Sequence, residues 1–305
     1  MKTKILITGG AGYIGSHTVI NLLKAGYEPI IVDNYCNSEE WILDQLHTLT
    51  GEKIKNYNAN CNDIEKLDTI FKNEQFGGVI HFAALKAVGT SVLEPLNYYK
   101  NNIGSLLSII ELMAKHSVPN LVFSSSCTVY GEADYLPVNE QHPIKTAESP
   151  YGCTKQMCEQ IINDCLKSNK LNSAVTLRYF NPVGAHPSGL IGELPLGTPN
   201  NLVPFITQTA AGIRSELTIF GNDYNTKDGT CVRDYIHVVD LAEAHVKALD
   251  YLGDNKPSVS LNIGTGRGST KTNTRGQQRQ KKRGDSLCTN KRVRGRAVRR
   301  KSGQK

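Results

Sequence analysis

Short apolar runs alternate with longer segments of helical periodicity along most of the chain. Lys4–Thr8 is a β-branched, apolar run typical of a buried parallel strand. The helical segment after it stops near Gly26, a common residue after a helix C-terminus. Further strand-like runs, with helical segments between them, lie at residues 29–33, 55–60, 78–83, 120–125 and 174–179. This alternation predicts an α/β fold with a doubly wound parallel sheet.

The expected helices between these strands include residues 63–71, 95–116 and 149–168. After Phe180 the sequence becomes rich in proline, glycine and asparagine, which predicts a loop-rich segment over 181–201. Later elements are expected as helices at 202–211 and 240–252 and as strands at 217–220, 232–237 and 261–263. We therefore predict a first domain over residues 1–180, with returning elements near 232–252, and a smaller part over 181–268.

Composition is that of a globular chain with a substantial core. It has 305 residues, 39% of them apolar and 21% charged. No run approaches the roughly 20 apolar residues of a membrane span. A strand beginning at residue 4 leaves no room for a signal peptide. The eight cysteines lack Cys-x-x-Cys spacing, so we expect reduced thiols, no metal site and a cytoplasmic protein.

The net charge of +7 belongs to the end of the chain. Residues 269–305 hold 14 of the 35 Lys and Arg residues and one of the 28 acidic residues. The remaining 268 residues therefore carry 21 basic and 27 acidic side chains, a mildly acidic balance of −6. Residues 1–268 are therefore mildly acidic, whereas residues 269–305 form a basic tail.

A glycine fingerprint lies between the first strand and its helix. Gly10-x-Gly12-x-x-Gly15 has the spacing of dinucleotide-binding loops, in which glycines make a tight turn, approach a pyrophosphate and pack helix on strand. Such turns are common alone, but here Asp33 ends a second strand 18 positions after Gly15. Its carboxylate would accept hydrogen bonds from ribose hydroxyls and repel a 2′-phosphate. The pattern predicts NAD rather than NADP.

Polar residues gather at predicted strand ends. They are Asn34 and the segments 84–86, 124–126 and 179–181. Ligands of open parallel sheets collect outside the carboxyl ends of the strands, so these groups are expected to share one site.

Tyr151 and Lys155 are four residues apart on an expected helix and therefore share one face. A tyrosine with a pKa near ~10 is a poor base, but a neighbouring ammonium or an oxidised nicotinamide lowers that pKa. Such a pair suits proton removal from an alcohol during oxidation by NAD. A surface pair is the usual interpretation of this spacing alone, but here a dinucleotide loop precedes it and Ser126 can hydrogen-bond the same oxygen.

The sequence resembles the extended short-chain dehydrogenases/reductases, and within them the UDP-sugar 4-epimerases. The resemblance spans residues 3 to about 268. The matching segments are residues 8–17, 33–38, 81–89, 124–131, 149–155, 177–189 and 228–238. Of these, the segments 177–189 and 228–238 are specific to the epimerases rather than to the superfamily.

The resemblance implies an isomerase of galactose metabolism that interconverts UDP-glucose and UDP-galactose. Tightly held NAD would oxidise the sugar at C4, the 4-keto intermediate would rotate, and re-reduction would follow on its other face. Residues 1–180 would bind NAD and residues 181–268 the UDP-sugar. A homodimer is compatible with the resemblance.

Site residues carried over by the resemblance fall into three groups. The catalytic residues would be Tyr151, Lys155 and Ser126. NAD would be contacted by Gly9, Gly12, Tyr13, Ile14, Gly15, Asp33, Asn34, Asn37, Ser38, Asn60, Lys86, Asn101, Tyr151, Lys155 and Tyr179. The UDP-sugar would be contacted by Ser126, Tyr151, Tyr179, Phe180, Asn181, Asn200, Asn201, Leu202 and Arg233. Asn60 replaces a usual aspartate, and its amide oxygen could still accept the adenine hydrogen bond.

The resemblance ends after Gly268, where the family continues for roughly seventy residues with further substrate contacts. Residues 269–305 contain five Leu, Val, Ala or Cys residues, too few for a core. We interpret this basic tail as disordered or frame-shifted, leaving the substrate domain incomplete and epimerase activity low. A nucleic-acid-binding arm is the alternative, but no aromatic residue is present to stack on bases.

Two other functions are less consistent with the residues. A nucleotide-sugar dehydratase needs carboxylates beside the serine at the strand end, where this chain has Cys127 and Thr128. A non-catalytic NAD-bound protein with a nucleic-acid-binding tail would be expected to lack Tyr151 or Lys155, and both are present.

Overall fold

The computed structural model describes residues 2–218 and 223–270, which fall into two compact units. The first unit comprises Met1–Glu193 and Ile236–Ile263, and the second comprises Leu194–Tyr235 and the residues from Gly264 onward. From residue 271 the predicted basic tail lies outside the described residues. Its first two residues, Ser269 and Thr270, belong to a strand of the second unit.

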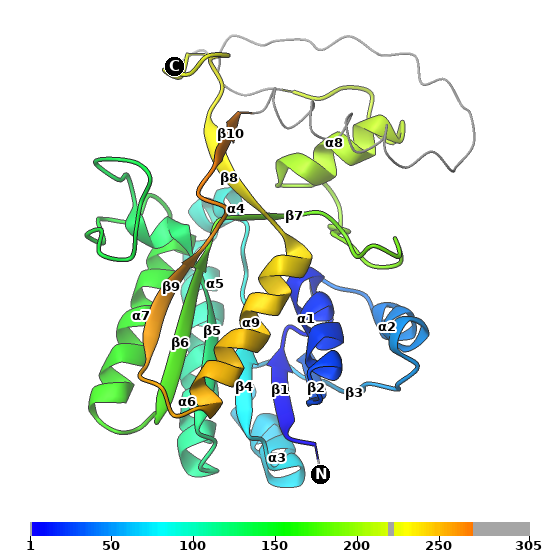
Figure 1. Cartoon of the computed structure of the whole chain (residues 1–305), viewed down its shortest axis with the longest axis vertical. Coiled ribbons are helices and arrows are strands. Elements are labelled where there is room, and N and C mark those ends of the chain that lie inside the picture. The colour runs from blue at the N-terminus through cyan, green and yellow to red at the C-terminus, as the bar shows by residue number, and fades with distance from the viewer. Residues whose placement is uncertain (1, 219–222, 271–305) are drawn as a thin grey trace. The chain divides into compact units, whose positions relative to one another are not determined.

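A parallel sheet of seven strands forms the middle of the first unit, in the order β3-β2-β1-β4-β5-β6-β9 (Figure 1). The predicted doubly wound α/β fold is confirmed. Chain order reverses beside β1, which pairs with both β2 and β4, so the carboxyl end of β1 lies at the switch point where such sheets bind ligands. The strands are β1 Lys4–Thr8, β2 Glu28–Asp33, β3 Lys55–Asn58, β4 Gly78–His81, β5 Asn120–Ser126, β6 Ser173–Tyr179 and β9 Val259–Ile263.

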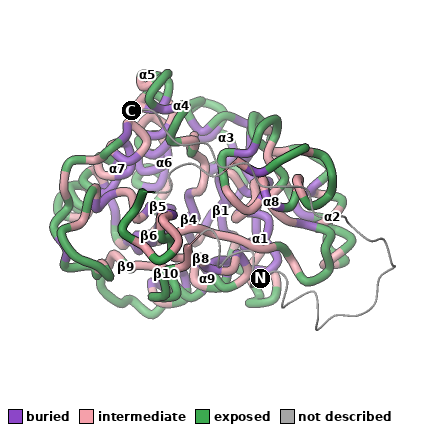
Figure 2. The backbone as a smooth tube through the Cα atoms, turned by 90° about the horizontal axis from the view of Figure 1, so that it is seen from above, coloured by how far each residue is buried: buried purple, intermediate pink, exposed green. Residues whose placement is uncertain are grey.

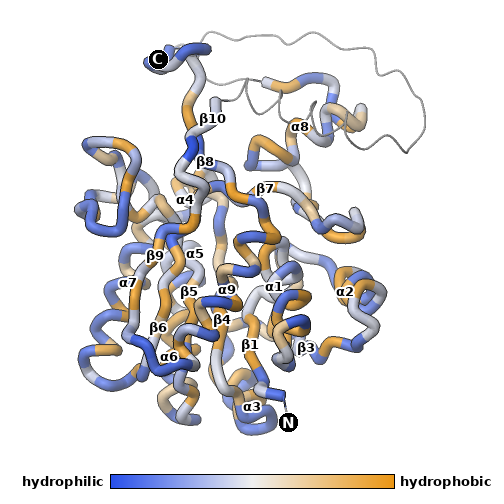
Figure 3. Tube along the Cα trace, viewed as in Figure 1, coloured by the Kyte–Doolittle hydropathy of each residue, from blue (hydrophilic) through white to orange (hydrophobic). Residues whose placement is uncertain are grey.

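Successive strand residues face two different helix layers because side chains alternate across a sheet. In β1, Ile5 and Ile7 pack into the core under α1, α2 and α9, whereas Leu6 packs into the core under α3, α6 and α7. Figure 2 shows the inner strands of the sheet as mostly buried, and Figure 3 shows their apolar character. The helices are α1 Tyr13–Lys24, α2 Ile42–Thr50, α3 Ile64–Glu74, α6 Gly104–Lys115, α7 Pro150–Lys167 and α9 Val238–Gly253.

The segment expected as one helix over 95–116 is helical from Pro95 to Lys115, but it is not a regular α-helix throughout. The segment is divided into α5 Pro95–Tyr98, a π-helical turn η1 Tyr99–Ile103 and α6. Within the turn, the buried Asn102 side chain accepts from Leu85 N at 2.8 Å and donates to Leu85 O at 3.0 Å. The wider turn lets this amide serve the backbone after β4, as π-bulges commonly do near functional sites. A short helix before it, α4 Val88–Leu93, was also not predicted.

The second unit contains α8 Leu202–Ala210 and an antiparallel pairing of β8 Val232–His237 with β10 Gly268–Thr270. The Asp234 carboxylate accepts hydrogen bonds from the backbone N–H groups of Thr265 at 3.0 Å and Gly266 at 2.8 Å. The strand expected at 217–220 is not formed at Leu217 and Thr218, and its other half lies outside the described residues. None of the helices within the described ranges is long and apolar enough to cross a membrane.

Candidate active site

The glycine loop after β1 is fixed by its own backbone. Gly9 has φ of +69°, and its N–H donates to Val32 O at 2.8 Å, which joins the loop to β2. A Cβ atom on Gly15 would lie only 2.4 Å from Gly9 O, so no side chain fits where α1 begins. N–H groups in the first turn of α1 have no acceptor one turn earlier, and they form an anion-binding end beside this loop. Gly9, Gly12, Tyr13, Ile14 and Gly15 therefore fit a pyrophosphate cradle.

Asp33 connects this cradle to the turn after β2. One carboxylate oxygen accepts from Ala11 N at 3.0 Å, and the other accepts from Tyr35 N at 2.9 Å and Ser38 Oγ at 3.1 Å. The carboxylate thus organises two loops, a role that the sequence did not reveal. In the same turn, Ser38 is half-buried and both Asn34 and Asn37 are exposed.

One asparagine, Asn62, links the next two predicted cofactor residues, Asn60 and Asn101. Asn60 Oδ1 accepts from Asn62 N at 2.9 Å, and Asn62 Nδ2 lies 3.4 Å from Asn101 O. The structure therefore brings Asn60, after β3, close to Asn101, in the π-helical turn. Asn62 was not among the predicted residues. Lys86, after β4, forms an ion pair with Glu193 at 3.3 Å.

Tyr151, Lys155 and Ser126 meet at the carboxyl end of β5. Tyr151 and Lys155 lie in the first turns of α7, whose N-terminus is capped by Ser149 Oγ accepting from Gly152 N at 3.1 Å. The Ser126 side chain lies near enough to Tyr151 to lower the tyrosine pKa. Lys155 Nζ donates to Ser124 O at 2.6 Å and lies 6.0 Å from the centre of the Tyr151 ring. The three predicted catalytic residues are therefore neighbours.

Burial controls the protonation of this pair. It raises the pKa of Tyr151 to about 12, and the nearby Ser126 side chain offsets part of that rise. Burial also lowers the pKa of Lys155 to about 8, against the opposing charge effects of Cys158 and Glu159. The expected lowering of the Tyr151 pKa is wrong for the protein alone, because desolvation, and after it the charges of Cys127, Tyr98 and Cys158, raise that pKa.

The end of β6 supplies the next predicted residues. The Tyr179 hydroxyl is hydrogen-bonded to Ser124 Oγ, and burial raises the Tyr179 pKa. Phe180 N donates to Ile263 O at 3.1 Å, and Asn181 begins the short strand β7 Asn181–Val183. These residues therefore follow directly from the strand that flanks Ser126.

The remaining predicted substrate residues belong to the second unit. Asn200 and Asn201 are exposed, and Asn201 is the N-cap residue of α8, which begins at Leu202. Arg233 is exposed on β8, where its backbone pairs with Ser269 of β10.

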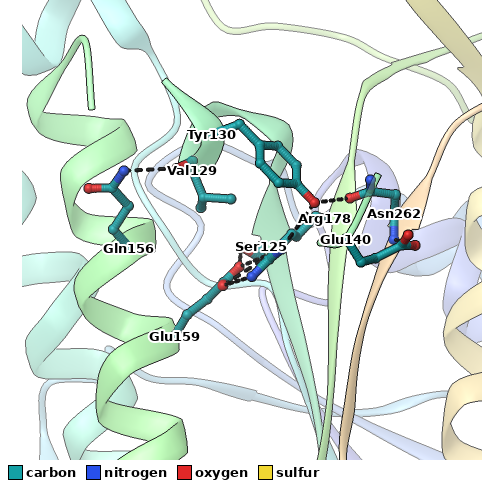
Figure 4. A network of polar contacts seen from close by, with 8 residues as sticks. All are labelled: Ser125, Val129, Tyr130, Glu140, Gln156, Glu159, Arg178 and Asn262. Atoms are coloured by element: carbon teal, nitrogen blue, oxygen red, sulfur yellow. Dashed lines mark hydrogen bonds and ion pairs between the residues drawn. The ribbon is translucent and has the colours of Figure 1, made fainter. Parts of the chain in front are cut away.

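A buried polar network behind the site was not predicted from the sequence (Figure 4). The Glu159 carboxylate on α7 accepts from Ser125 Oγ at 2.5 Å and forms a forked ion pair with Arg178, whose Nη2 lies 2.6 Å from Oε2. A signal was present, because Tyr151, Lys155 and Glu159 recur every four residues and so form one stripe on the helix.

The strand order and the anion-binding end of α1, with the Tyr151–Lys155 pair beside the end of β5, define an α/β protein of the dinucleotide-binding class. Residues 5–264 match the NAD dependent epimerase/dehydratase family, and the chain belongs to this family.

Relatives and solved structures agree with that assignment. The chain is 53% identical over 266 residues to a UDP-glucose 4-epimerase of Dictyostelium discoideum, covering 87% of this chain and 77% of the relative. A UDP-glucose 4-epimerase structure from Bifidobacterium longum, in complex with NAD+ and UDP, has a TM-score of 0.85 at 45% identity and covers 88% and 80% of the two chains. The epimerase structure from Stenotrophomonas maltophila, with NAD and formylated UDP-arabinopyranose, has a TM-score of 0.86 at 46% identity and the same coverage.

Proposed function

We propose that this chain is an NAD-containing isomerase that interconverts UDP-glucose and UDP-galactose by reversible oxidation at C4 of the sugar. The observation that carries the proposal is the meeting of Tyr151 with Ser126, beside a lysine held by Ser124 O. It is supported by about 50% identity to UDP-glucose 4-epimerases over most of the chain.

Tyr151 is the proposed proton acceptor and donor for the 4-hydroxyl. NAD, when bound, supplies the reversible oxidation at C4 and, in its oxidised form, a positive charge that favours the Tyr151 phenolate. Ser126, whose side chain lies near Tyr151, orients the sugar oxygen towards the phenol. Lys155, positioned on Ser124 O, holds the nicotinamide ribose and adds a second positive charge when protonated.

The first unit holds NAD in this proposal. Its pyrophosphate would be held by the glycine cradle and the N-terminus of α1, and Asp33 would accept from the adenosine ribose, which favours NAD over NADP. The surrounding contacts come from the exposed turn after β2, the linked amides and the residues at the ends of β4 and β6. These residues are Asn34, Asn37, Ser38, Asn60, Lys86, Asn101 and Tyr179.

The UDP-sugar contacts are proposed for each unit separately. In the first unit they are Tyr179, Phe180 and Asn181, at the end of β6, and in the second unit they are Asn200, Asn201, Leu202 and Arg233. Since the hexose must present both faces of C4 in turn, the uridine diphosphate provides most of the binding. A dehydratase is less well supported, because Cys127 and Thr128 follow Ser126 where that reaction needs carboxylates.

A homodimer is the proposed assembly. Large apolar side chains are exposed on α4, α5 and α7, which pack beside one another, and on α6, which follows α5 through the π-helical turn η1. Exposed apolar groups gathered in this way mark protein interfaces, and here we assign the face to a second copy. Its residues are Val92, Leu93, Leu96, Leu107 and Met157.

The test is conversion of UDP-galactose to UDP-glucose by the purified chain, with the cofactor released by denaturation and identified by mass. We expect NAD(H) and measurable conversion. The matched variant Tyr151→Phe keeps the ring but removes the proton acceptor, and should lower turnover by roughly 10²–10⁴-fold while retaining NAD. Bound NADP(H), or a Phe variant as active as its parent, would contradict the proposal.

A further inference from the structure

Two charged residues, neither of them among the proposed ligand contacts, are buried behind the Tyr151–Lys155 pair. Glu159 is 4% exposed and Arg178 is 6% exposed. A buried ion pair is weak evidence for stability, because desolvation of two charges offsets most of their attraction. Stability alone therefore does not account for this buried ion pair, and its geometry indicates another role.

The pair joins the elements that carry the catalytic residues. Glu159 lies on α7 one helical turn beyond Lys155 and two turns beyond Tyr151, on the same stripe. Arg178 is the residue of β6 that pairs with Ser125 of β5. Ser125 lies between Ser124 and Ser126. The contacts of Glu159 with Ser125 and Arg178 therefore fix the position of α7 along its axis relative to the carboxyl end of β5.

The same guanidinium also holds the turn that follows Ser126. Arg178 Nη1 donates to the Tyr130 hydroxyl at 3.0 Å, and that hydroxyl donates to Asn262 Oδ1 at 2.7 Å. Tyr130 ends the 3-10 turn η2 Cys127–Tyr130, which begins directly after Ser126 (Figure 4). From α7, Gln156 Nε2 donates to Val129 O of this turn at 2.8 Å.

We propose that Glu159 and Arg178 are positioning residues, whose forked ion pair sets the register of α7 on β5 so that Lys155 meets Ser124 O and Tyr151 meets Ser126. The forked ion pair restrains the position of α7 along its own axis, because two parallel hydrogen bonds allow little sliding of the helix. A displacement of about one ångström at this point would misplace both functional groups at once. The inference rests on the proposed function for its effect on turnover, but its effect on NAD affinity does not depend on that function.

The discriminating variant is the double substitution E159L/R178M in the full chain. It removes both charges together, so no unpaired charge remains buried, and such replacements are often neutral for stability. We expect an unfolding midpoint within a few degrees of the parent and NAD affinity at least tenfold weaker. Where epimerisation is measured, kcat should fall about tenfold with KM for UDP-galactose within about twofold, because neither residue touches the sugar.

The matched control is E74Q. Glu74, on α3, is another buried carboxylate in an ion pair, with Lys4 Nζ at 2.8 Å. Lys4 begins β1 of the same sheet. The E74Q substitution should lower the unfolding midpoint while leaving NAD affinity within about twofold. A purely structural role would make NAD affinity follow the unfolding midpoint across both variants, and NAD affinity of the double variant equal to that of the parent would also overturn the proposal. A parent chain that binds NAD but converts no UDP-galactose would refute only the proposed function, since the affinity comparison would still stand.

Discussion

Gly15 is the residue at which α1 and the glycine loop come closest. Because a Cβ there would lie 2.4 Å from Gly9 O and 2.8 Å from Gly10 Cα, Gly15→Ala must displace the loop backbone. We expect a loss of about 1–3 kcal/mol in unfolding free energy, as in other overpacked sites, together with at least tenfold weaker NAD binding. Denaturant unfolding and equilibrium dialysis measure the two effects.

Gly89 provides the control for that variant. It lies in helix α4, and a Cβ there would meet no atom within 4 Å. Gly89→Ala should therefore stabilise the protein by about 0.5–1 kcal/mol through the helix preference of alanine, with NAD binding unchanged. If both alanine variants lose NAD affinity equally, the close approach of Gly15 to Gly9 O does not determine NAD binding.

Lys155 provides a prediction about pH. Burial lowers its folded pKa from 10.5 to about 8, so folding disfavours its charged form. The resulting cost, about 3 kcal/mol, is present in full below pH 8, declines between pH 8 and 10.5, and is absent above. Lys155→Met removes this cost but also loses the hydrogen bond to Ser124 O, about 1 kcal/mol.

The methionine variant should therefore be more stable than the parent at pH 7 and lose that advantage as pH rises towards 10.5. Unfolding free energies at pH 7 and pH 10 provide the measurement. If the unfolding free energies of parent and variant differ by the same amount at pH 7 and pH 10, burial of the charged Lys155 does not cost stability.

At the scale of elements, the start of α7 is the feature that most directly affects the site. Ser149 Oγ caps the helix two residues before Tyr151, and Ser149→Ala should cost about 1 kcal/mol of stability. The control is Asp63→Ala, which removes the cap of α3, where Asp63 Oδ1 accepts from Lys66 N at 3.1 Å. Both variants should unfold at lower denaturant, but only the α7 variant should also lose NAD affinity. Comparable NAD losses in the two would contradict this.

Local patterns predicted elements better than contacts between elements. The β-branched runs and their glycine boundaries were sufficient for the parallel sheet, because buried strands and amphipathic helices impose different periods on the chain. The π-helical turn at Tyr99–Ile103 could not be predicted, because it serves a contact between Asn102 and the distant backbone of Leu85.

The candidate site divides in the same way. The glycine fingerprint and the Tyr151–Lys155 spacing are local, and the structure brings Ser126 to that pair. The ion pair of Glu159 with Arg178 depends on the register of β5 with β6, which no local pattern encodes. The predicted lowering of the Tyr151 pKa was wrong for a similar reason, because the desolvation of a side chain depends on the whole fold.

At the scale of the whole molecule, the exposed apolar face on α4 and α5 leads to a prediction about assembly. Leu93 is 82% exposed and Leu96 is 71% exposed. The pair of substitutions Leu93→Glu and Leu96→Glu would place two charges in the proposed dimer contact and should give a monomer by sedimentation. Leu136→Glu changes a leucine that is 77% exposed elsewhere, between η2 and α7, and should leave the dimer intact. A dimer that survives the double substitution would locate the contact on another face.

Helix α9 of the first unit is synthesised long after the strands that it covers. Helix α9 packs on α1 and covers β5 and β6, yet it is separated from β6 by the whole of residues 180–237. At about 5–20 residues per second of synthesis, roughly 4–15 seconds pass between the end of β6 and the end of α9. During that interval the apolar side chains of Val122, Val175 and Leu177, which share a core with α9, have no covering helix. A nascent chain of this protein should therefore be most prone to aggregation after its nucleotide-binding strands have been made, and chaperones that hold ribosome-bound chains should act mainly in this interval.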